Sequence, residues 1–156
     1  MIARKRWLPL VTFGALAAAV MLVSVRRHPA AISVSVRYLG STNYLNWGDT
    51  SMFAVTNRSA SIVRRQGWLG VEDRNTGTTM VGMNQDSRVL GPGEGEVVML
   101  QTPTNGGAWR LMLTVEEIDL RRRVNEAAGE AGVAKHLPAR FRAMPQYSFT
   151  SDWVQP

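Results

Sequence analysis

The sequence contains no cysteine, and this absence excludes several classes of protein. Without thiols the chain cannot build a disulfide framework or bind zinc through cysteine ligands. A lipid-anchored lipoprotein is excluded as well, because the lipid is attached to a cysteine at the processing site. The absence leaves the compartment open, since many exported domains have no disulfide.

Histidine is scarce, and recognised catalytic patterns are missing. His136 is the only histidine after residue 30, and no nucleophile-elbow sequence accompanies it to form a Ser-His-acid triad. The stretch Gly91–Gly95 lacks the Gly-Lys-Ser/Thr ending of a phosphate-binding loop. The carboxylates cluster at expected strand ends without EF-hand spacing, at Glu72-Asp73 and Glu116-Glu117-Asp119. We therefore expect no catalytic residue, metal site or cofactor, and keep a hydrolase without a recognisable motif as the alternative.

One stretch, from Trp7 to Val25, has no charged residue. At about 1.5 Å of rise per residue a helix of this length spans about 28 Å, close to the hydrocarbon thickness of a bilayer. A cleaved signal is the alternative, because Ala17-Ala18-Ala19 fits a cleavage site, but the apolar run continues past it. We predict that residues 1–30 hold a basic flank, a single transmembrane helix and a linker.

The positive charge of the chain is concentrated around this stretch. Three basic residues precede it and Arg26-Arg27 follow it, which favours a cytoplasmic N-terminus and a domain on the extracytoplasmic side of the cell membrane. These five account for most of the net charge of +6, because the other 13 Lys and Arg residues face 12 acidic residues. The remainder of the chain is thus nearly neutral. We expect the lipid bilayer as a partner and no nucleic acid.

Residues 31–156 alternate between apolar and polar side chains in several short segments. The alternation is clearest in 109–115 and 32–38, and it is typical of half-buried antiparallel strands. Residues 40–43 are expected to form a turn. Gly91-Pro92-Gly93-Glu94 predicts a type II turn with a positive φ at Gly93. Further strands are expected at 52–56, 61–73, 78–83, 96–101 and 147–154.

The apolar period then changes to that of a helix near residues 119–131, with Leu120, Val124 and Ala128 on one face and Asp119 as its cap. The helix begins with Arg121, Arg122 and Arg123. These three arginines are the candidate contact for a partner or for anionic lipid headgroups, and a solvated helix face is the alternative. Basic and aromatic residues downstream extend this candidate surface, namely Arg140, Phe141, Arg142 and Tyr147.

Four tryptophans of the domain are expected mainly in the core, with an aromatic ligand platform as the alternative. They are Trp47, Trp68, Trp109 and Trp153.

The strand ending in Val55-Thr56-Asn57-Arg58-Ser59 and the later Gly107-Ala108-Trp109-Arg110 resemble uncharacterised small bacterial proteins with one N-terminal span. Together with the Leu-x-Pro-Gly turn they are similar to immunoglobulin-like and fibronectin type III-like modules. The resemblance covers residues 32–118 and implies an antiparallel β-sandwich, here with a C-terminal helical excursion. It transfers no site residues. We expect a membrane-tethered interaction or scaffold module with an unknown protein partner; a purely structural envelope protein is a further alternative.

Overall fold

The computed structural model describes residues 31–44, 48–77, 79–104, 106–142 and 144–155. The predicted membrane anchor, Trp7–Val25, lies outside the described residues. Within those residues no helix is long and apolar enough to cross a bilayer. Ala31–Pro156 forms one compact unit, to which the following description applies.

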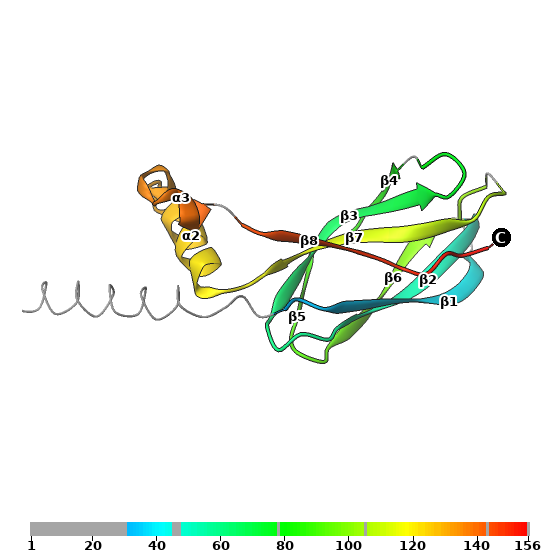
Figure 1. Cartoon of the computed structure of the whole chain (residues 1–156), viewed down its shortest axis with the longest axis horizontal. Helices are drawn as coiled ribbons and strands as arrows, with labels where there is room; N and C mark the ends of the chain where they lie inside the picture. The colour runs from blue at the N-terminus through cyan, green and yellow to red at the C-terminus, as the bar shows by residue number, and fades with distance from the viewer. Residues whose placement is uncertain (1–30, 45–47, 78, 105, 143, 156) are drawn as a thin grey trace, which may run out of the picture. The chain divides into compact units, whose positions relative to one another are not determined.

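Two antiparallel sheets lie face to face (Figure 1). Sheet A has the order β1-β2-β6, with bounds β1 Val34–Tyr44, β2 Gly48–Asn57 and β6 Gly95–Gln101. Sheet B has the order β4-β3-β7-β8, and β5 also pairs with β3. Its strands are β3 Val63–Asp73, β4 Thr79–Asn84, β5 Arg88–Leu90, β7 Trp109–Glu117 and β8 Gln146–Thr150. The order matches A-B-E facing C′-C-F-G of immunoglobulin-like sandwiches, except that β5 pairs with β3 rather than with β6; the predicted antiparallel sandwich is confirmed.

The core lies between the two sheets and follows the alternation of each strand. Phe53 from sheet A and Trp109 from sheet B meet edge to face, with ring centroids 5.7 Å apart. The buried apolar residues around them come from both sheets and include Val55, Val63, Leu69, Val71, Val98, Leu100, Leu111, Leu113 and Val115. Full burial of each large side chain contributes about 1.5–3 kcal/mol, so this layer is the main source of stability.

A buried ion pair joins the two sheets. Arg65 of β3 and Glu96 of β6 have side chains 3% and 5% exposed, with Nε and Oε1 2.5 Å apart. The guanidinium also donates to the carbonyl oxygens of Gln66 and Asp86. Because both charges are desolvated, removing one partner alone would leave a buried charge without compensation.

The predicted type II turn is present. Gly93 has φ +78°, and the amide of Glu94 donates to the carbonyl of Gly91 over 3.0 Å. The buried side chain of Asn57 holds this turn against the end of β2, because its amide donates to the carbonyls of Ser61, Leu90 and Gly91. One side chain thus satisfies three backbone acceptors at this corner of the sandwich.

Two segments differ from the sequence-based expectation. Residues 40–43 do not turn: β1 continues through them as far as Tyr44, and Gly40, with φ +122°, takes up a register shift opposite Met52. The glycine therefore forms an irregularity within a long strand. The short strand β5 was not expected; three residues alone give too little alternation to be recognised.

The helical excursion is inserted between β7 and β8, at one end of the sandwich (Figure 1). It comprises α2 Leu120–Glu130, η2 Ala134–His136 and α3 Ala139–Arg142. Asp119 caps α2 as predicted, accepting from the amide of Arg122. The helix ends in a Schellman motif around Gly132, at φ +71°, where the amide of Val133 donates to the carbonyl of Ala128.

The predicted apolar stripe of this helix is wrong in one respect. Ala128 is buried and Val124 half-buried, but Leu120 is exposed, as are Ala127 and Ala131. Polar contacts on another face of α2, described below, attach the helix to sheet B.

Candidate interaction surfaces

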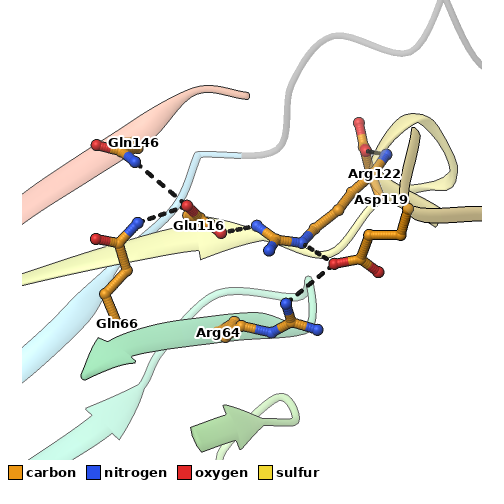
Figure 2. Close-up of polar contacts among 7 residues, drawn as sticks. Arg64, Gln66, Glu116, Asp119, Arg122 and Gln146 are labelled. Atoms are coloured by element: carbon orange, nitrogen blue, oxygen red, sulfur yellow. Dashed lines mark hydrogen bonds and ion pairs between the residues drawn. The ribbon is translucent and has the colours of Figure 1, made fainter. Parts of the chain in front are cut away.

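A network of charged and amide side chains attaches α2 to sheet B (Figure 2). Arg122 forms ion pairs with Glu116 of β7 and, 2.8 Å from Nε to Oε1, with Glu126 one turn further along the helix. Arg64 of β3 reaches the same Glu126 oxygen over 3.0 Å. Two amides, from Gln66 and Gln146, also donate to Glu116.

The ion pairs of Glu116 and of Glu126 differ in solvent exposure and therefore in how much they stabilise the fold. The side chains of Arg122 and Glu116 are 13% and 10% exposed, so their pairing is largely shielded from water. Glu126 is 42% exposed, and its pairs are screened and weak. The hydrogen bond from Arg122 lowers the pKa of Glu126, partly offset by desolvation, and the nearby charge of Arg64 lowers it further. Arg122 is thus the principal link between the excursion and the sandwich.

The three arginines of the predicted contact surface are in different environments. Arg121 bonds Asp119, with Nε and Oδ2 2.6 Å apart, and Arg122 belongs to the network just described. Arg123 is exposed, and no described acidic side chain pairs with it. Downstream, Phe141 is buried and Tyr147 packs against the core, so neither contributes an exposed ring to this surface. Arg121 and Arg123 remain the accessible members of the predicted site.

The outer face of sheet A has apolar residues on β2 and β6, and Leu39, in the bulge of β1, is exposed as well. Met52 pairs with Met99, and Ala54 pairs with Val97, in the register of β2 and β6. Val97 is 55% exposed and Met99 37%, and Leu39 on β1 is 43% exposed. We call these five residues the sheet A patch. An antiparallel sheet with one face on the core normally has a polar outer face, so the patch requires an explanation beyond folding.

Arg37 lies at the β1 end of the patch. It pairs with Ala54 in the register of β1 and β2, its side chain is exposed, and no described acidic residue pairs with it. An apolar surface with one uncompensated positive charge at its border is complementary to a protein surface that is apolar and has a carboxylate at its rim.

The outer face of sheet B has a hollow of about 190 Å³. Trp68 forms one wall, and Gly70, Met112, Thr114 and Ser148 line the remainder on the outward face. Trp68 was expected in the core, but it is 59% exposed. Trp68 lies between Arg65 and Leu69, which are both buried, so the alternation of β3 places its side chain on the outer face. Between the pairs Arg65–Val115 and Leu69–Leu113, three residues of β3 stand opposite one residue of β7, and the two extra residues leave this alternation unchanged.

The other tryptophans have structural roles where they are described. Trp109 is buried, as predicted, and Trp153 is half-buried with Arg110 and Arg74 near its ring, at 4.6 and 5.7 Å from the centroid. Arg110 is also paired with Glu72 over 2.7 Å. Trp47 lies outside the described residues.

The carboxylates considered for catalysis serve local structure. Glu72 pairs with Arg110, Asp73 accepts from two backbone amides of the following turn, and Glu117 accepts from the hydroxyl of Ser61. His136 is exposed on η2. In the part of the chain that the structure describes, no three His, Asp or Glu side chains gather as a metal site would require.

Comparison with known proteins adds little to this description. No protein-family model and no curated protein matches the chain. Among solved structures, the PapD-like domain 7 of human CEP192, described as an ASH/PapD-like domain, matches 83% of this chain and 90% of its own, with 10% identity and a TM-score of 0.32. A likeness this distant carries no argument about function, and the fold rests on the strand order itself.

Sequence reasoning missed both outer-face surfaces, although each has a signal in the sequence. The runs Met52–Val55 and Val97–Leu100 are apolar at every position, which breaks the alternation expected of a half-buried strand. Trp68 is followed by Leu69-Gly70-Val71, and an alternation that turns Leu69 and Val71 toward the core would have placed Trp68 on the outer face.

Proposed function

We propose that the chain is a non-enzymatic, membrane-tethered interaction module that binds a protein partner through the sheet A patch. The tether is Trp7–Val25, and the domain from residue 31 stands on the extracytoplasmic side. The observation that supports binding is the apolar outer face of sheet A, with Leu39, Val97 and Met99 exposed beside the unpaired Arg37. The partner surface is apolar with a carboxylate facing Arg37.

Site-specific photo-crosslinking in native membranes tests this proposal. A photoreactive residue replaces Val97 in the patch of the full chain, and in the matched control it replaces Val89 of β5, which is similarly exposed outside the patch. We expect a discrete crosslinked species from position 97 only. Its yield should fall several-fold when Met99→Ser and Arg37→Glu are introduced.

Equal crosslinking from positions 97 and 89 would refute the proposal, as would a yield unaffected by Met99→Ser and Arg37→Glu. A product with the mass of two chains would identify a second copy as the occupant and contradict a distinct partner. Turnover of an ester, peptide or glycoside by the purified chain, abolished by one Ser, Asp or Glu substitution, would favour the enzyme alternative.

The accessible arginines of α2 supply a second candidate contact, for an acidic partner or for anionic lipid headgroups. Arg122 must be left unchanged in its test because it anchors the helix. Arg121→Ser with Arg123→Ser should weaken sedimentation of the chain with anionic vesicles relative to neutral ones. If sedimentation is unaffected, these side chains are ordinary solvated charge.

A further inference from the structure

The hollow on the outer face of sheet B has the chemistry of a binding site that is separate from the sheet A patch. Its lining includes Trp68, which is more than half exposed, and two residues with hydroxyls, Thr114 and Ser148. Thr114 and Ser148 are directly paired between β7 and β8, which places their side chains next to each other. Neither hydroxyl bonds another described residue, so both are available to a ligand.

The charge of this face narrows the class of ligand. Among the residues that the structure describes, no charged side chain lines the hollow. Along the same strands, the charges toward one end are paired as Glu72 with Arg110, and those toward the other as Glu116 with Arg122. An anionic or cationic ligand would therefore lose its hydration here without meeting an opposite charge. A neutral ligand has no such penalty.

Shape and polarity narrow the class further. Gly70, which lines the hollow beside Trp68, contributes no side chain to it and so leaves room for a flat ring. The ligand must present a flat face of C–H groups to the negative face of the indole ring and hydrogen-bonding groups at its edge to the two hydroxyls. An aliphatic or aromatic peptide side chain would offer the two hydroxyls no hydrogen-bonding group.

We propose that this hollow binds one neutral pyranose ring of an oligosaccharide, stacked on Trp68 and hydrogen-bonded to Thr114 and Ser148. A pyranose has an apolar C–H face and hydroxyls around its edge, and an uncharged sugar matches the uncharged lining. The site is shallow and open to solvent, so the affinity is low and each of the named side chains contributes a large share of it.

Isothermal titration calorimetry on the full chain tests the proposal, in a zwitterionic detergent because glycoside detergents would compete. The probes are cellohexaose, maltohexaose and chitohexaose, and an oligogalacturonate serves as the charged comparison. We expect millimolar or tighter binding of at least one neutral hexasaccharide and none of the oligogalacturonate. Trp68→Ala should weaken binding by about tenfold or more, and Trp68→Phe should weaken it less.

Two further variants separate stacking from hydrogen bonding. Thr114→Val with Ser148→Ala removes the hydroxyls and should also weaken binding, while Gly70→Val places a side chain in the hollow and should abolish it. Val89→Ala, an exposed position outside the hollow, is the matched control and should bind as the native chain does. Far-UV circular dichroism of each variant verifies folding, and Trp68→Phe keeps the test decisive if Trp68→Ala does not fold.

The proposal is overturned if none of the three hexasaccharides binds the native chain, if Trp68→Ala and Gly70→Val both bind as the native chain does, or if the oligogalacturonate binds more tightly. Binding of an apolar peptide through Trp68 without oligosaccharide binding would overturn it too. These results do not depend on the sheet A patch, so failure here and failure of the proposed function are distinguishable.

Discussion

Replacing Arg122 by Met should release α2 from the sandwich, because this residue is the main link between them. The change keeps much of the apolar stem but leaves Glu116, whose side chain is 10% exposed, without its positive partner. Breaking a fully buried pair costs about 3–5 kcal/mol. Here some solvent access and the two amide donors to Glu116 reduce the loss, and the screened pair with Glu126 adds only about 0.3–0.5 kcal/mol.

We therefore expect Arg122→Met to lower the free energy of unfolding by about 2–3 kcal/mol, which corresponds to roughly 10 °C in the melting temperature of a domain of this size. Thermal unfolding followed by far-UV circular dichroism measures the global effect, and amide hydrogen exchange shows whether protection is lost first in α2. The matched control is Arg123→Met. Arg123 follows Arg122 in the sequence but is exposed, so this change should alter the free energy of unfolding by less than about 0.5 kcal/mol.

A double variant distinguishes the charge from the packing. Glu116→Gln removes the charge that Arg122→Met leaves unpaired, so the two changes together should cost less than their sum. If Arg122→Met is as mild as Arg123→Met, or if the double variant is strictly additive, the network does not hold the helix in the way described.

Three further perturbations follow from the structure. Asn57→Ala should cost about 2–4 kcal/mol in denaturant unfolding, because it removes a buried side chain whose amide donates to the carbonyls of Ser61, Leu90 and Gly91. Gly93→Val should cost about 1–3 kcal/mol, because a β-branched residue is strained at φ +78°; an unchanged melting midpoint would contradict the turn. The lowered pKa of Glu126 means that its small stabilising contribution is present above its ordinary value of about 4.5 and is lost as pH falls through the lowered pKa. Hydrogen exchange of α2 between pH 5 and 3 should show this loss, and Glu126→Gln should remove it.

The fold was largely predictable from the sequence because its information is local. The alternation at 109–115 and the Gly91-Pro92-Gly93 turn each determine a backbone conformation through residues that are close together in the sequence. Both predictions are confirmed. The prediction that Asp119 is the N-cap of the helix is confirmed as well. The turn predicted at residues 40–43 was wrong because a glycine with positive φ occurs in a bulge as well as in a turn. Which of the two forms depends on the pairing with the partner strand.

The surfaces were less predictable because they depend on contacts between distant segments. Nothing near Arg122 in the sequence shows that it reaches Glu116 while Arg123 remains exposed. Trp68 was assigned to the core by its size, whereas the alternation of β3 around the buried Leu69 and Val71 places it on the outer face. The sheet A patch required knowledge of which strands are neighbours.

The position of the helical excursion has a consequence for the evolution and engineering of this domain. Its two ends leave and rejoin the sheet at adjacent points, because Glu116 of β7 is directly paired with Gln146 of β8. The segment between β7 and β8 can therefore be exchanged. A short hairpin loop can connect the two strands at little entropic cost, and a different insertion can replace the excursion without altering the sandwich. Any replacement of the excursion would also have to supply the positive partner of Glu116 that Arg122 now provides, or make that position neutral.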